Sequence, residues 1–144
     1  MHLVDANVLI YATNQDAPNH TVAHEWLTRH LDGPETIGFS WTVLLAFARI
    51  TTRAGLLPSP LTIGQAFDAI DSWLERPAAV IVEPTVRHRH VLRDLLGRTG
   101  TSGNLTSDAH LAALALEHGA TICSFDTDFA RFADLRWTTP TADT

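Results

Sequence analysis

Short apolar runs recur along the chain at intervals that helices can fill. The run AlaAlaValIleValGlu at 78–83 is rich in β-branched residues, which is typical of a parallel strand buried on both faces. Four other stretches share this apolar character and are too short to be core helices. Together they predict five strands: His2 to Val4, Thr36 to Phe39, 78–83, 120–125 and LeuArgTrpThr at 135–138.

Between these runs, apolar residues return every three or four positions, which is the spacing of an amphipathic helix. Ser40 is suited to cap the helix that begins at Trp41, and Gly119 is suited to end the helix before it in a left-handed conformation. The predicted helices are Asn7 to Ala12, His20 to Leu31, Trp41 to about Arg53, Thr62 to Leu74, Thr85 to about Arg98, Leu105 to His118 and a short one from Asp128 to Phe132.

Strands that alternate with helices of this length place the chain in the α/β class. Such an order predicts three layers, α/β/α, around a central parallel sheet of about four or five strands. The 144 residues are enough to bury one hydrophobic core, so we expect a single domain over 1–144.

Composition narrows the possible chemistry. All ten basic residues are arginines, and the net charge is −6. Without lysine, a P-loop, a Schiff-base enzyme or a phospho-acceptor receiver domain is excluded in its usual form. An acidic domain binds nucleic acid poorly by charge alone, so an RNA substrate would require a local arginine patch or a metal ion.

The amino-terminal segment predicts neither a secretion signal nor a membrane span. No basic leader precedes its apolar run, and Asp5 and Asn7 interrupt that run. Cys123 is the only cysteine, which agrees with a reducing compartment. We therefore expect a cytoplasmic protein.

Three aspartates occupy positions where ligands bind in α/β proteins. Asp5 and Asp126 follow predicted strands, and ligand sites lie beyond the carboxyl ends of such strands. Asp108 begins an apolar helical stripe, so its carboxylate is expected to face inward, where it needs a partner or a cation. Each acid alone is better explained as a turn or cap residue. Together they would repel one another unless a divalent cation held them, and such a site hydrolyses phosphodiesters.

Three segments resemble PIN domains, especially the VapC toxins of bacterial toxin–antitoxin modules. They are LeuValAspAlaAsnValLeuIleTyrAla at 3–12, ThrSerAspAlaHisLeuAlaAlaLeuAlaLeuGluHisGlyAlaThrIle at 106–122 and SerPheAspThrAspPheAlaArgPhe at 124–132. Their order and spacing match over nearly the whole chain. The resemblance implies a PIN-like fold, an endoribonuclease that depends on Mg²⁺ or Mn²⁺, a homodimer and a VapB-type antitoxin partner, whose basic tail would reach the carboxylates with an arginine.

The resemblance also assigns roles to single residues. Asp5, Asp108 and Asp126 match the family's catalytic, metal-binding acids, and Asp128 matches a weaker accessory acid. Two further residues match polar positions that line such sites, although an Asx-turn asparagine and an N-cap serine explain them equally well: Asn7 and Ser40.

The chain departs from the family pattern in the helix after the second strand. Ala46 stands about where PIN domains commonly have a glutamate, so one-metal catalysis and a weakened enzyme are both open. Glu35 and Glu83 are not expected to replace it. The same helical face remains partly polar. Arg49 on this face is expected to line the substrate site and to have an anionic partner. That face holds Thr42, Arg49 and Arg53.

Two other functions compete with the nuclease. An aspartate-nucleophile phosphatase needs a second aspartate two residues after the first, where Asn7 stands, and a lysine, which is missing. A catalytically degenerate PIN module that binds antitoxin or RNA without cleavage is the stronger alternative, with Ala46 as its sign. The eight histidines form no zinc pattern and are interpreted mostly as surface or capping residues, with His110 and His118 on the polar side of the late helix.

Overall fold

Five parallel strands form one sheet in the order β3-β2-β1-β4-β5. The computed structural model describes residues 1–142. The earliest strand lies in the middle of the sheet, paired on one side with β2 and on the other with β4. The strands are β1 (His2–Val4), β2 (Ile37–Phe39), β3 (Ala79–Ile81), β4 (Thr121–Cys123) and β5 (Trp137–Thr138).

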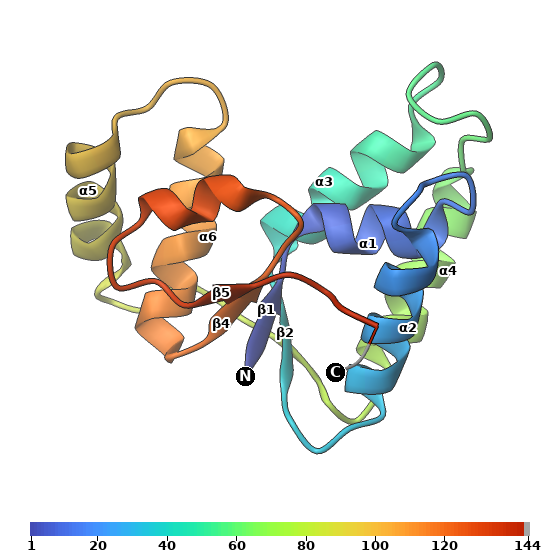
Figure 1. Cartoon of the computed structure of the whole chain (residues 1–144), viewed down its shortest axis with the longest axis horizontal. Coiled ribbons are helices and arrows are strands. Elements are labelled where there is room, and N and C mark those ends of the chain that lie inside the picture. The colour runs from blue at the N-terminus through green and yellow to red at the C-terminus, as the bar shows by residue number, and fades with distance from the viewer. Residues whose placement is uncertain (143–144) are drawn as a thin grey trace.

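The strand order determines which helices cover which face of the sheet. Right-handed crossovers that step from β1 to β2 to β3 place their helices on one face, and the return from β3 to β4 places its helices on the other. Figure 1 shows α1 to α4 gathered on one side and α5 and α6 on the other, which confirms the α/β/α prediction. The helices are α1 (Ala6–Thr13), α2 (His20–Leu31), α3 (Trp41–Thr52), α4 (Ile63–Leu74), α5 (His88–Thr99), α6 (Leu105–His118) and the 3₁₀ helix η1 (Thr127–Arg131).

Local capping explains where several helices begin and end. The Ser40 hydroxyl accepts from the Val43 N–H at 3.3 Å, and Gly119 ends α6 with a φ of 63°, as predicted. The helix α5 begins later than expected because Thr85 serves a tertiary contact instead. Its N–H and its hydroxyl both donate to the Glu117 carboxylate.

The core lies where the central strands meet the two helical layers. Leu3, Ile37 and Phe39 are fully buried. The prediction that the third strand is buried on both faces was wrong, since Val80 and Ile81 are 38% and 37% exposed. The reason is topological: β3 is an edge strand. Within residues 1–142, no helix is long and apolar enough to cross a membrane.

Candidate functional site

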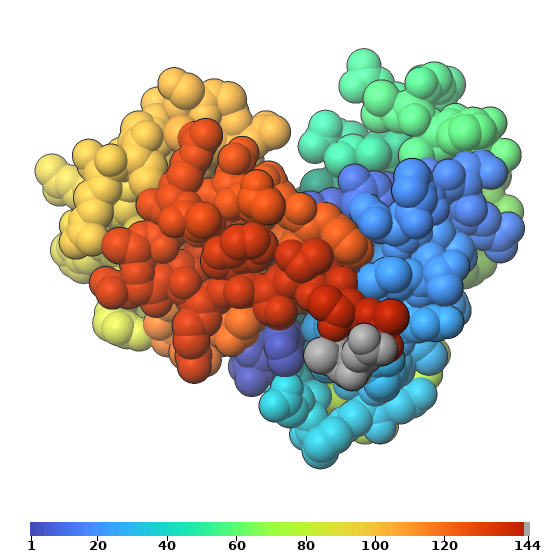
Figure 2. Space-filling model, viewed as in Figure 1, coloured from blue at the N-terminus to red at the C-terminus, as the bar shows by residue number. Residues whose placement is uncertain are grey.

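A pocket of about 910 Å³ opens at the carboxyl ends of β1 and β4. Asp5, Asp108 and Asp126 all line it, so the structure brings together the three acids singled out in the sequence. The opposite wall comes from α3. Figure 2 shows the hollow between the late helices, yellow to orange, and α3, teal. This is the position where open parallel sheets bind ligands.

Asp5 is fixed at the floor of the pocket by its neighbours. One carboxylate oxygen accepts from the Ala6 N–H at 2.8 Å and so caps α1. The other accepts from the Ser124 hydroxyl at 2.7 Å and from the Asn7 amide at 3.4 Å. Burial raises the pKa of Asp5 despite the hydrogen bonds from Ser124 and Ala6, and the charge of Asp126 raises it further. These hydrogen bonds therefore orient the carboxylate, but they do not fully compensate the burial of its charge.

Ser124 joins two of the acids and was not recognised in the sequence. It is fully buried, and while its hydroxyl donates to Asp5 it accepts from the Asp126 N–H at 3.0 Å and from the Asn7 amide at 3.0 Å. A buried hydroxyl at the end of β4 requires such partners. The sequence signal that could have identified Ser124 is its position two residues before Asp126, directly after a predicted strand residue.

Asn7 belongs to the same hydrogen-bond network as Asp5 and Ser124. It lines the pocket, and its side-chain oxygen accepts from the Phe125 N–H at 3.1 Å. The segments that follow β1 and β4 are thereby tied together next to Asp5 and Asp126.

The three carboxylates interact electrostatically across the pocket. Burial raises the pKa of Asp108 to about 6, with further contributions from Asp5, Asp126 and Asp128 that Arg131 only partly offsets. The charges of Asp5 and Asp126 therefore disfavour the ionisation of Asp108, and the charge of Asp126 disfavours that of Asp5. Such a set is stabilised by a bound cation or by the loss of one charge.

Removal of one charge tests this repulsion. We expect Asp108→Asn to raise the melting temperature of the metal-free protein at pH 7.5. Because the folded pKa of Asp108, about 6, lies above its ordinary value of 3.8, its ionised form destabilises the fold above pH 6, and this penalty fades as pH falls towards 4. Thermal unfolding in EDTA at pH 7.5 and at pH 4 measures it.

The exposed Asp68, which lies on α4 outside the pocket, supplies the control Asp68→Asn. An equal gain from Asp108→Asn at both pH values would contradict the repulsion.

Three other predicted site residues lie differently from the acids. Arg49 lines the pocket, but it is exposed and forms no ion pair within the described chain, so the expectation of an anionic partner was wrong. Its guanidinium reaches solvent instead of the core. Ser40 is the buried N-cap of α3, and Asp128 is exposed beside Arg131 at 3.8 Å. Neither is among the residues that line the pocket.

The α3 wall carries no carboxylate. Ala46 faces the pocket together with Thr42 and Arg49, in agreement with their shared helical face. Glu35 pairs with His2 at 3.2 Å, at the far end of β1, and the Glu83 carbonyl accepts from His118 at 2.7 Å. As expected, neither glutamate replaces the missing acid.

The donor set has the chemistry of a divalent-cation site without being closed around an ion. Within residues 1–142, no group of three His, Cys, Asp or Glu side chains is placed so that it could hold a metal ion. The pocket nevertheless supplies three carboxylates that repel one another, and carboxylate oxygens are the ligands that Mg²⁺ and Mn²⁺ prefer. The residues therefore fit such an ion chemically.

A chain of hydrogen bonds behind the pocket was missed in the sequence. The Glu117 side chain is fully buried and lies 2.5 Å from Nδ1 of His88. Nε2 of His88 lies 2.9 Å from Nδ1 of His110, which lines the pocket. The interpretation of these histidines as surface residues was wrong, because a partner some thirty positions away leaves no periodic signal.

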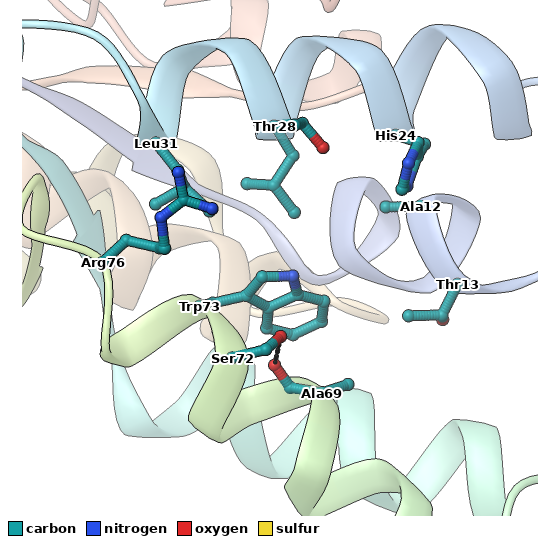
Figure 3. A pocket seen from close by; sticks show the side chains of 10 residues that line it. Ala12, Thr13, His24, Thr28, Leu31, Ala69, Ser72, Trp73 and Arg76 are labelled. Atoms are coloured by element: carbon teal, nitrogen blue, oxygen red, sulfur yellow. Dashed lines mark hydrogen bonds between the residues drawn. The ribbon is translucent and has the colours of Figure 1, made fainter.

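A second, smaller pocket of about 280 Å³ lies among α1, α2 and α4. Figure 3 shows the Trp73 indole at its centre and Arg76 at its rim, where Arg76 forms an ion pair with Asp32. Among the residues that the structure describes, no acidic side chain lines it. Its chemistry therefore differs from that of the carboxylate pocket.

Comparison with known proteins gives consistent results. The family model of the PIN domain matches residues 2–135. The chain is 49% identical to Ribonuclease VapC37 of Mycobacterium tuberculosis over 99% of both chains. Among solved structures, the Sarcin-Ricin loop cleaving toxin VapC20 of M. tuberculosis aligns with a TM-score of 0.70 at 19% identity, covering 94% of this chain and 99% of its own. VapBC2 from Rickettsia felis, bound to a DNA fragment from their promoter, aligns with a TM-score of 0.66 at 20% identity, covering 96% and 97%.

Proposed function

Because this chain belongs to the PIN-domain family and is similar over its full length to VapC ribonucleases, we propose that it is a metal-dependent endoribonuclease. Asp5, Asp108 and Asp126 are its catalytic, metal-binding acids. The observation that carries the proposal is the convergence of these acids, from three distant segments, on one pocket. Their mutual repulsion supports a role that requires a cation.

In the proposed phosphodiester hydrolysis, the metal ion, Asp5 and Arg49 have different roles. Bound Mg²⁺, or Mn²⁺ in its place, supplies charge stabilisation on the phosphoryl oxygens and acidifies a water molecule. Asp5 is held in one orientation by Ala6 and Ser124, which is the preorganisation that a ligand carboxylate needs. Arg49, exposed on the facing wall and without an ion-pair partner among residues 1–142, binds a backbone phosphate of the RNA.

The missing acid at Ala46 leaves three carboxylates for the metal. Two-metal sites need bridging and flanking carboxylates, and the α3 wall offers only Thr42 and Arg49 near Ala46. We propose a one-metal site. The same absence favours the second candidate function, a degenerate PIN module that binds RNA or antitoxin without cleavage.

We further propose that the chain is the toxin of a VapBC-type module and acts in the cytoplasm as a homodimer with a VapB-type antitoxin. The net charge of −6 attracts a basic segment. An arginine of that segment, inserted into the pocket, would form charge-assisted hydrogen bonds with the carboxylates. The fold shared with R. felis VapBC2 supports this assembly.

The experiment that separates the two functions is incubation of total RNA with the purified chain in Mg²⁺, Mn²⁺ or EDTA. We expect discrete cuts with either metal and none in EDTA, because the acids alone repel one another and cannot stabilise the phosphoryl charge. Mapping of the new RNA ends measures it. Intact RNA under all three conditions, combined with binding of labelled RNA, would instead establish the degenerate module.

A further inference from the structure

A charged side chain, Glu117, is buried outside the carboxylate pocket. The Glu117 side chain has no solvent exposure, and burial raises its pKa, but hydrogen bonds from Thr85 and His88 outweigh burial and lower it. The Thr85 N–H donates at 3.0 Å and its hydroxyl at 2.5 Å. Glu117 is thus held as an acceptor-only carboxylate, which is costly to bury unless it is fully satisfied.

The buried carboxylate sets the direction of the hydrogen bonds that follow. Because Glu117 can only accept, Nδ1 of His88, at 2.5 Å, carries the hydrogen. In a neutral pair of imidazoles, Nε2 of His88 is then bare and accepts from Nδ1 of His110 at 2.9 Å. The same logic leaves Nε2 of His110 as a bare acceptor.

That acceptor belongs to the carboxylate pocket. His110 lines the pocket with Asp108 and Leu111, and its ring meets that of His88 edge-on, at 78°. Within residues 1–142, Nε2 of His110 makes no hydrogen bond and is not buried. An open acceptor on a residue that lines the pocket is suited to a hydrogen-bond donor of the substrate.

His118 shows what a purely structural histidine on the same helix does. Its Nε2 lies 2.7 Å from the Glu83 carbonyl, and it does not line the pocket. His110 differs because the chain from Glu117 ends on it and leaves its outer nitrogen open. The hydrogen bonds from Thr85 and His88 would be enough to satisfy Glu117 if it served packing alone. The further hydrogen bond between His88 and His110 would not be needed for that purpose.

We propose that Glu117 and His88 are positioning residues that hold the His110 imidazole as a hydrogen-bond acceptor for a 2′-hydroxyl of the RNA substrate. The proposal rests on the ribonuclease function proposed above. The 2′-hydroxyl, which can donate and accept, is the group that distinguishes RNA from DNA, and an acceptor in the pocket lined by the catalytic acids selects for it.

The first test removes the acceptor. Loss of one neutral hydrogen bond corresponds to roughly a five- to tenfold change in affinity, so we expect His110→Ala to raise KM for RNA by about that factor with kcat little changed. His118→Ala is the matched control and should leave both constants as in the wild type. An unchanged KM in His110→Ala overturns the proposal.

The second test reverses the hydrogen bonds without changing the shape of the chain. In Glu117→Gln the side-chain amide donates to Nδ1 of His88, so the chain runs the other way and His110 presents N–H to the pocket. A 2′-hydroxyl can also accept from this N–H, so we expect a rise in KM no larger than that of His110→Ala, and no further rise when both changes are combined. Additive losses would mean that Glu117 acts on the fold and not through His110.

A binding measurement separates failure of this inference from failure of the proposed function. Fluorescence anisotropy with labelled RNA and DNA oligonucleotides of one sequence, in EDTA, needs no cleavage. The wild type is expected to prefer RNA by about five- to tenfold, and His110→Ala is expected to lose this preference. If the wild type cuts nothing but the preference depends on His110, the nuclease is wrong and the acceptor stands; if His110→Ala keeps the preference, the acceptor is wrong.

Folding of the variants is checked by thermal unfolding. If Glu117→Gln fails to fold, His88→Asn breaks the same chain while the contacts from Thr85 to Glu117 remain. It is expected to match His110→Ala in KM and in the loss of the RNA preference. A wild-type KM in His88→Asn would overturn the positioning role.

Discussion

Asp5→Asn is expected to reduce RNA cleavage by roughly a thousandfold or more, the largest effect of any single change in this chain. Changes in the groups that orient a metal ligand typically cost ten- to hundredfold, and removal of a ligand charge also removes part of the electrostatic stabilisation of the reacting phosphate. Single-turnover cleavage of a defined RNA, with Mg²⁺ or Mn²⁺ at saturation, measures the loss.

The fold is expected to survive this change. Burial raises the pKa of Asp5, so a neutral side chain relieves a penalty even though the hydrogen bond from Ser124 must rearrange. Asp68→Asn, a surface change outside the pocket, should cleave like the wild type. Activity of Asp5→Asn within tenfold of the wild type, in folded protein, would remove Asp5 from the catalytic set.

Phe47→Ala is expected to have the largest effect on stability, about 3–5 kcal/mol of unfolding free energy. Phe47 is fully buried and meets Trp73 edge-on with ring centroids 5.0 Å apart, so it joins α3 to α4. The loss is a large share of an ordinary domain's stability and corresponds to a fall in melting temperature of roughly 10–20 °C. Urea unfolding and calorimetry measure both quantities.

Phe67→Ala is the matched control, since Phe67 lies on α4 but is 38% exposed. It should change the unfolding free energy by less than about 1 kcal/mol. Equal losses in the two variants would mean that Phe47 has no special place in the α3–α4 contact. Because α3 carries the pocket wall that includes Arg49, Phe47→Ala is also expected to weaken RNA binding.

The helices could be predicted from the sequence because their signals are local. The helix His20–Leu31 agrees with its prediction at both ends, and so does Leu105–His118, where Gly119 supplies the expected left-handed cap. Strand burial was less predictable. The composition of 78–83 indicated a central strand, but only the order of strands in the sheet determines that β3 lies at its edge.

The acids of the site were predictable for a topological reason. In a parallel sheet every strand ends at the same edge, so Asp5 and Asp126 had to lie near each other once both were placed after strands. The link between Glu117, His88 and His110 was not predictable, because it depends on how α5 packs against α6. The exposure of Arg49 was not predictable either, because it depends on how the side chain reaches the surface from α3.

Because β1 pairs with β4, the carboxylate pocket can form only after the later part of the chain has been made. Asp5 is made before Ser124, which orients it and lies 119 positions later, and β1 pairs with β4 through residues from the same later segment. At roughly 5–20 residues per second, the newborn chain spends several seconds without a complete set of acids. Translation that stops before β4 therefore yields fragments without the assembled pocket, and under the proposed function such fragments leave cellular RNA intact.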